Sequence, residues 1–147
     1  MKYITIDEYY SDDDANINKK LNEYSKYFDT IIRNHLSKSF VSKYLKCCGF
    51  HDWDVVSIEN NAYTYDHPKR DLIVTLHKKS GNITKKIHYN KVRVFKINLN
   101  KSHFEQWSYD EYVIDEFLLL DNSYLSHEVY FPSGSSYYVE FKTIKII

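Results

Sequence analysis

The stretch Phe50–Ile58 reads Phe-His-Asp-Trp-Asp-Val-Val-Ser-Ile, and it marks the place where the apolar pattern of this 147-residue chain changes. Before it, apolar residues recur at the spacing of a helix, and after it they alternate as they do along a strand. A chain of this length suits one domain. We therefore predict a single α+β domain over residues 1–147, with a helical arm at 1–49 folded onto an antiparallel sheet at 50–147.

Two helices are expected in the arm. Ser11 and the three aspartates after it form a helix start signal, because a hydroxyl can cap backbone N–H groups and carboxylates favour the positive end of a helix. A second apolar stripe begins at Phe40, and its helix is predicted to end at Gly49, which tolerates positive φ. The first helix is predicted over about residues 12–34, with its stripe at Ile17, Leu21, Tyr24, Phe28 and Ile31 or Ile32.

The rest of the chain predicts a meander of about seven short antiparallel strands. Residues 2–6 also alternate, and they are expected to form an edge strand or an extended lead-in. The other strands are predicted at about residues 53–58, 71–77, 83–89, 92–98, 112–120, 124–131 and 136–146, with a connecting loop at 100–110.

The composition narrows the functional classes. The chain has 20 Lys and Arg against 20 Asp and Glu, and this balance disfavours a protein that binds nucleic acid by neutralising phosphates. The N-terminus lacks the apolar core of a signal peptide and no apolar run is long enough to span a membrane, so a cytoplasmic protein is expected. The 15 tyrosines are explained either by biased base composition or by a tyrosine-rich binding face.

One candidate for chemistry is His51-Asp52, since some metal-dependent phosphohydrolases use such a pair. Those enzymes hold the pair on a helix among further ligands, whereas here the pair opens a strand. We therefore predict that Gly49, His51 and Asp52 form a structural corner and that the chain has no catalytic residue, metal or cofactor. A metal-assisted hydrolase that uses His51 and Asp52 is kept as an alternative function.

The carboxylates of Asp110, Glu111, Asp115 and Glu116 form a second candidate, because paired carboxylates serve acid–base catalysis. Neighbouring residues of a strand point to opposite faces, so Asp115 and Glu116 cannot share a cleft. We predict that one of the two is buried or lies at an edge with a basic partner such as Arg93 or Lys142.

A basic middle segment is the third candidate, and Tyr89 and Phe95 lie between its cations. On a sheet, such a segment could bind single-stranded nucleic acid, which is a second alternative function. We favour a solvated face in which lysines protect strand edges. The cations are Lys78, Lys79, Lys85, Lys86, Lys91, Arg93 and Lys96.

The chain resembles a family of small intracellular proteins of Bacillus and its relatives, a domain of unknown function. The likeness lies in Met1–Tyr10, in His51-Asp52 followed by Val55-Val56-Ser57-Ile58, and in Asp115-Glu116-Phe117 with the strands His127–Phe131 and Val139-Glu140-Phe141. The pattern at His51-Asp52 is also similar to that of immunity proteins of bacterial polymorphic toxin systems.

This resemblance implies a cytoplasmic, non-enzymatic binding protein with a protein partner, in the most concrete case a toxin domain that it neutralises by direct contact. The family supplies no catalytic residues. An acidic, tyrosine-bearing surface is then expected to cover the partner. The candidate contact residues are Asp52, Asp54, Glu59, Asp110, Glu111 and Tyr112.

Overall fold

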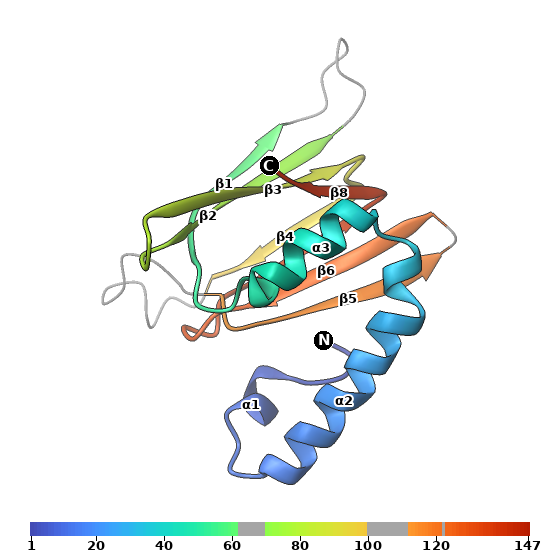
Figure 1. Ribbon diagram of the computed structural model, residues 1–147, viewed down its shortest axis with the longest axis vertical. Coiled ribbons are helices and arrows are strands. Elements are labelled where there is room, and N and C mark those ends of the chain that lie inside the picture. Colours follow the sequence, from blue (N-terminus) through green and yellow to red (C-terminus); the bar gives the residue numbers. More distant parts are fainter. Residues whose placement is uncertain (62–69, 100–111, 122) are drawn as a thin grey trace.

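A computed structural model describes residues 1–61, 70–99, 112–121 and 123–147. This part of the chain confirms the α+β class, because helices pack on two antiparallel four-stranded sheets (Figure 1). The helices are α1 (Ile6–Tyr9), α2 (Asp14–Thr30) and α3 (Lys38–Lys46), with single 3₁₀ turns η1 (Ile32–Asn34) and η2 (Cys48–Phe50). The strands are β1 (Asp54–Asn61), β2 (Asp71–Lys78), β3 (Ile83–Asn90), β4 (Val94–Asn98), β5 (Ile114–Asp121), β6 (Tyr124–Tyr130), β7 (Ser136–Phe141) and β8 (Thr143–Ile146).

The prediction of one sheet of about seven strands needs correction. The described residues contain eight strands, and they divide into a first sheet with the order β1-β2-β3-β8 and a second sheet with the order β4-β7-β6-β5. The predicted meander is present within each sheet, as β1-β2-β3 and as β5-β6-β7. Two passages of the chain, from β3 to β4 and from β7 to β8, connect the sheets.

The predicted strand at 136–146 is in fact two strands, because the chain bends at Lys142. The other passage bends beside it. The amide of Lys142 donates to the carbonyl of Asn90 at 3.2 Å, and the amide of Arg93 donates to the carbonyl of Glu140 at 3.0 Å. The two passages therefore cross from one sheet to the other side by side.

The helices begin at other residues than predicted, because other side chains cap them. Helix α2 begins two residues later than expected, because the Asp13 side chain, and not that of Ser11, accepts the amide of Asn16. Helix α1 was not predicted. Its cap is a reciprocal one, in which Thr5 accepts the amide of Glu8 while the Glu8 carboxylate accepts the amide of Thr5.

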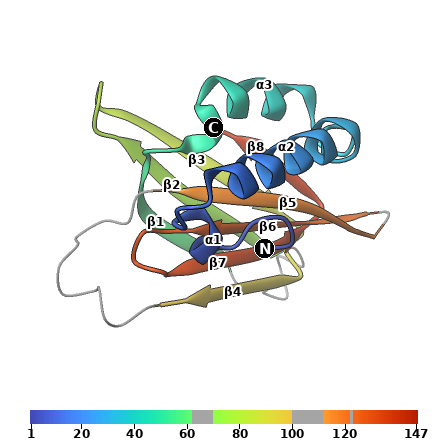
Figure 2. The ribbon, with the colours of Figure 1, turned by 90° about the horizontal axis from the view of Figure 1, so that it is seen from below.

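Helix α3 lies over the sheets, and the C-terminal half of α2 runs beside the edge strand β5 (Figures 1 and 2). The aromatic ring of Phe117 on β5 packs against Phe28, Phe40 and Tyr44 of these helices, at centroid distances of 6.2, 5.9 and 5.7 Å. This cluster is continuous with buried aliphatic residues of both sheets, so helices and sheets share one core.

Two tyrosines of α2 complete the hydrogen bonding of β5. The hydroxyl of Tyr24 accepts the amide of Phe117 at 2.6 Å, and the hydroxyl of Tyr27 accepts the amide of Leu119 at 3.0 Å. An unpaired strand edge invites pairing with other chains. The helix therefore protects this edge with side chains rather than with a further strand.

We expect Tyr24→Phe to lower the free energy of unfolding by about 1–2 kcal/mol, because it leaves the partly buried amide of Phe117 without an acceptor. Urea denaturation measures this loss. The matched control is Tyr10→Phe, which removes the same atom from an exposed ring and should change stability little. Equal stability of both variants and the wild type would show that the Tyr24 hydroxyl does not stabilise the edge.

Candidate functional site

The backbone between α3 and β1 has an unusual geometry. Gly49 has the expected positive φ, +65°, but α3 already ends at Lys46, and Cys48, Phe50 and Asp52 also have positive φ, at 51°, 64° and 65°. Side chains at such positions are strained. His51 Nδ1 lies 2.8 Å from Asp52 Oδ1, and both side chains are well exposed. The two side chains thus contact each other at the surface of the corner.

The predicted contact residues do not form one surface. Asp52 and Glu59 are exposed, as expected. Tyr112 is only 1% exposed, because its ring packs on Phe50 and its hydroxyl belongs to a buried network, so its prediction as a contact residue is wrong. Asp54 is also buried. Asp110 and Glu111, like the whole loop predicted at 100–110, lie outside the described residues.

A buried polar network joins the helices to both sheets. Asp115 accepts a hydrogen bond from the Tyr44 hydroxyl at 2.8 Å, and its Oδ2 lies 2.8 Å from His127 Nε2. The Tyr112 hydroxyl lies 3.0 Å from the same nitrogen, and the Tyr89 hydroxyl lies 2.6 Å from His127 Nδ1. The hydroxyl of Tyr137 extends the network at 3.1 Å from that of Tyr89.

A neutral His127 beside an ionised Asp115 satisfies these contacts. His127 then donates from Nε2 to Asp115, and Nδ1 accepts a hydrogen bond from the Tyr89 hydroxyl. Burial, reinforced by the negative charge of Asp115, raises the pKa of Tyr44 well above its ordinary value. The pKa of Tyr89 is also raised well above the ordinary value, first by burial.

Asp115 and His127 are residue types that form acid–base dyads in enzymes, but here they lie in the core of the protein. His127 is 0% exposed and stacks on Phe117 with 3.8 Å between ring centroids. Glu116 is 2% exposed, as predicted for one of the two carboxylates, but Arg93 is not its partner. Arg93 instead contacts Asp121 at 2.9 Å and Glu140 at 2.5 Å.

Asp115 and Glu116 do point to opposite sides of β5, as the alternation of a strand predicts. Glu116 accepts the amides of Lys2 at 2.6 Å and Tyr3 at 2.8 Å, so it holds the N-terminal segment against the outer side of the second sheet. Both carboxylates are therefore engaged in contacts that hold the fold together.

The outer side of the second sheet carries what we call the tyrosine face. Alternation along β6 and β7 places three half-buried tyrosines there among side chains of both charges. The Arg93 guanidinium lies 4.1 Å from the ring centroid of Tyr124, and Lys96 Nζ lies 5.9 Å from that of Tyr138. The face consists of Arg93, Lys96, Tyr124, Glu128, Tyr130, Tyr138, Glu140 and Lys142.

A hydrogen bond orders one ring of the tyrosine face, and a hollow lies beside it. The Tyr138 hydroxyl donates to Glu140 at 2.7 Å, and burial followed by this hydrogen bond raises the pKa of Tyr138 to about 12. A hollow of about 460 Å³ opens between β4, β6 and β7, lined by Lys96, Ile97, Asn98, Glu128, Tyr130, Ser136 and Tyr138. Tyr138 thus presents an ordered, neutral ring beside an open depression.

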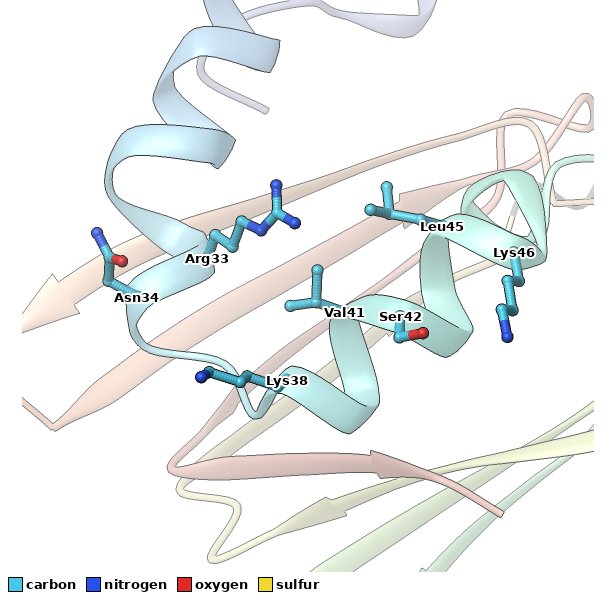
Figure 3. A pocket seen from close by; sticks show the side chains of 7 residues that line it. All are labelled: Arg33, Asn34, Lys38, Val41, Ser42, Leu45 and Lys46. Carbon is cyan, nitrogen blue, oxygen red and sulfur yellow. The ribbon is translucent and has the colours of Figure 1, made fainter.

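Two further hollows lie elsewhere. One, of about 560 Å³, lies between η1 and α3, where Arg33, Lys38 and Lys46 surround Val41 and the exposed Leu45 (Figure 3). The other, of about 440 Å³, lies on the first sheet beside Asp54.

The basic middle segment does not form a single face. Lys85 and Lys86 belong to β3 of the first sheet, whereas Arg93 and Lys96 lie on the second sheet beside carboxylates. Lys79 Nζ lies 3.3 Å from Asp54 Oδ2. The positive charges are thus divided between two sheets.

Among the described residues, no cluster of three or more His, Cys, Asp or Glu side chains is arranged to hold a metal ion. The same part of the chain contains no helix of the length and apolar character needed to cross a membrane. Comparisons with family models, with curated proteins and with solved structures found no match.

The sequence analysis missed the tyrosine face, although a signal for it exists. The even-numbered positions of β6 are mostly polar or aromatic, and so are those of β7. In β6 they are Tyr124, Ser126, Glu128 and Tyr130, and in β7 they are Ser136, Tyr138 and Glu140. The residues of opposite parity are mostly apolar, so the polar, tyrosine-bearing side had to face outward.

Proposed function

We propose that this chain is a non-enzymatic protein-binding module, in its most concrete form an immunity-type protein that neutralises a bacterial toxin by direct contact. The tyrosine face is its contact surface. The observation that carries the proposal is the gathering of Tyr124, Tyr130 and Tyr138 on the outer side of one sheet, next to a hollow and beside the N-terminal segment, whose Met1 amino group lies 2.7 Å from Glu128 Oε2. Tyrosine and arginine are the residues that most often dominate binding energy at protein interfaces.

The rings are ordered before binding. Tyr124 lies beneath Arg93, and Tyr138 is tied to Glu140, so little side-chain freedom is left to lose when a partner docks. The face therefore offers ordered aromatic anchors and a depression for a protruding side chain.

The charges of the face favour a protein over a nucleic acid as the partner. Glu140 pairs with Arg93 and Glu128 pairs with the amino group of Met1, and carboxylates repel phosphates. A protein surface can match charges of both signs. A labelled single-stranded oligonucleotide tests the alternative, since tight binding that weakens steeply with salt would replace the proposal with nucleic-acid recognition.

We expect the chain to bind the toxin domain encoded beside its own gene and to restore growth when the two are expressed together. Replacing Tyr130 and Tyr138 by alanine should weaken binding by tenfold or more, because each truncation at an anchor typically costs more than 1 kcal/mol. Isothermal titration calorimetry measures the affinity, and colony counts measure protection.

The matched control is Tyr10→Ala, which truncates an exposed tyrosine of the helical arm, and equal melting temperatures establish that all variants fold. If the Tyr130 and Tyr138 double variant bound the toxin domain with wild-type affinity, the tyrosine face would not be the contact surface. Failure of the chain to bind or neutralise the neighbouring toxin domain would contradict the immunity function itself.

A further inference from the structure

The first residue of β1 is a buried carboxylate that is only partly paired. Asp54 is 3% exposed, and its Oδ1 accepts no hydrogen bond within the described ranges. Its Oδ2 lies 3.3 Å from Nζ of Lys79, whose own side chain is 69% exposed. Leaving a charged acceptor buried without a donor destabilises the folded chain. Asp54 is therefore placed to gain from a ligand that donates N–H groups.

Asp54 lines a hollow on the outer side of the first sheet. The hollow extends across β1, β2 and β3, and Figure 1 shows these strands side by side. His77 lies directly opposite Asp54 in the register of β1 and β2, and its Nδ1 is 3.4 Å from the Thr84 hydroxyl. The hollow has a volume of about 440 Å³ and is lined by Asp54, Val56, Thr75, His77, Lys79 and Thr84.

We propose that this hollow is a binding site for a guanidinium group, such as the side chain of an arginine in a peptide. A guanidinium is planar and carries parallel N–H donors, so it can engage Oδ1 and share Oδ2 with or in place of Lys79. The hydroxyls of Thr75 and Thr84 are further acceptors at the same wall.

The rest of the site suits the remaining parts of an arginine. Val56 stands in the irregularity of β1, is 49% exposed, and offers apolar surface to the methylene stem. Lys79 lies at the rim on a long stem, so its ammonium can withdraw when a better-matched cation enters. The site lies on the first sheet, apart from the tyrosine face on the second, and does not depend on the proposed function.

The test is a titration of the full chain with N-acetyl-arginine methylamide, followed by amide chemical shifts in NMR spectra. We expect saturable shifts at Asp54, Val56, Thr75, His77 and Thr84. The citrulline analogue, which has the same shape without the charge, should bind at least tenfold more weakly. The lysine analogue should also bind more weakly, because an ammonium lacks the planar pair of donors.

Asp54→Asn should abolish the response to the arginine amide, whereas Glu59→Gln, the same loss of charge at an exposed position of β1, should leave it intact. The comparison of arginine with citrulline needs only the wild-type chain, so it decides the matter even where Asp54→Asn does not fold. Absence of saturable shifts, or equal affinity for citrulline, would overturn the site. Equal affinity for lysine would overturn the assignment to guanidinium.

Discussion

Replacing Asp115 by alanine is expected to lower the free energy of unfolding by about 3–5 kcal/mol, because it removes the acceptor at the centre of a buried network. The substitution would leave the Nε2 proton of His127 and the hydroxyl of Tyr44 without their partner in the core. It would also leave a small void beside Tyr112. A loss of this size is a large fraction of the stability of a typical domain.

Urea denaturation followed by circular dichroism measures the loss. Asp115→Asn keeps one oxygen acceptor at the same place and should cost less than half as much. Asp29→Ala is the surface control, since Asp29 forms only an exposed pair with Arg33, at 3.2 Å. If Asp115→Ala were no less stable than Asp29→Ala, the network would not stabilise the fold and a functional reason for burying these groups would be needed.

Alkali is expected to unfold the protein sharply between about pH 11 and pH 12. Burial raises the pKa of five tyrosines above the ordinary value of 10.0. Four take part in the Asp115 network, and the fifth accepts an amide of the edge strand. The five are Tyr24, Tyr44, Tyr89, Tyr112 and Tyr137.

The sign of this pH dependence follows from the number of protons that the folded and the unfolded chain bind. Below pH 10 these phenols are protonated in both states, and their contribution to stability is complete. Above pH 10 the unfolded chain releases the protons while the folded chain keeps them, so stability falls by about 1.4 kcal/mol per tyrosine and pH unit. Five such groups together give a fall of about 7 kcal/mol per pH unit, until the raised folded pKa values are reached.

Tyrosinate absorbance and circular dichroism, recorded on the same samples, measure this transition. Exposed tyrosines should ionise gradually around pH 10, whereas a second group should ionise in one step with the loss of secondary structure. Tyr137→Phe removes one of the five groups and should make the loss of stability with pH less steep by about a fifth. Complete ionisation of all tyrosines before any loss of secondary structure would show that these side chains are open to solvent.

Local signals in the sequence predicted the elements well. Gly49 and the change of periodicity after it located the end of the helical arm, since positive φ and alternation are properties of short stretches. The alternation of Asp115 and Glu116 correctly excluded a shared cleft. The missed helix α1 also had a local signal, the Thr5 and Glu8 capping pair, which the alternation of residues 2–6 obscured.

The division into two sheets could have been predicted in part. Val139 and Phe141 are buried at odd positions, whereas Ile144 and Ile146 are buried at even ones, and this change of parity marks the bend at Lys142. Parity does not show which strands pair, because β8 joins β3 through hydrogen bonds between distant parts of the chain. Sheet order is set by such contacts and not by periodicity.

The site residues were predicted least well, since burial of polar groups depends on tertiary contacts. Tyr112 and Asp54 look like surface residues in the sequence, yet both are covered once β1 and β5 are in place. The His51 and Asp52 pair lies between η2 and β1, but no sequence pattern indicates that Cys48, Phe50 and Asp52 have positive φ. A tyrosine can cap an edge, close a network or form a contact face, and its neighbours in space decide which.

The two chain passages that cross side by side, from β3 to β4 and from β7 to β8, have a consequence for cooperativity. Each passage joins a strand of one sheet directly to a strand of the other, and both sheets pack on the same core, so separating the sheets would expose that core. The two halves of the β structure therefore behave thermodynamically as one unit, and contact made by a partner on one sheet also stabilises the other.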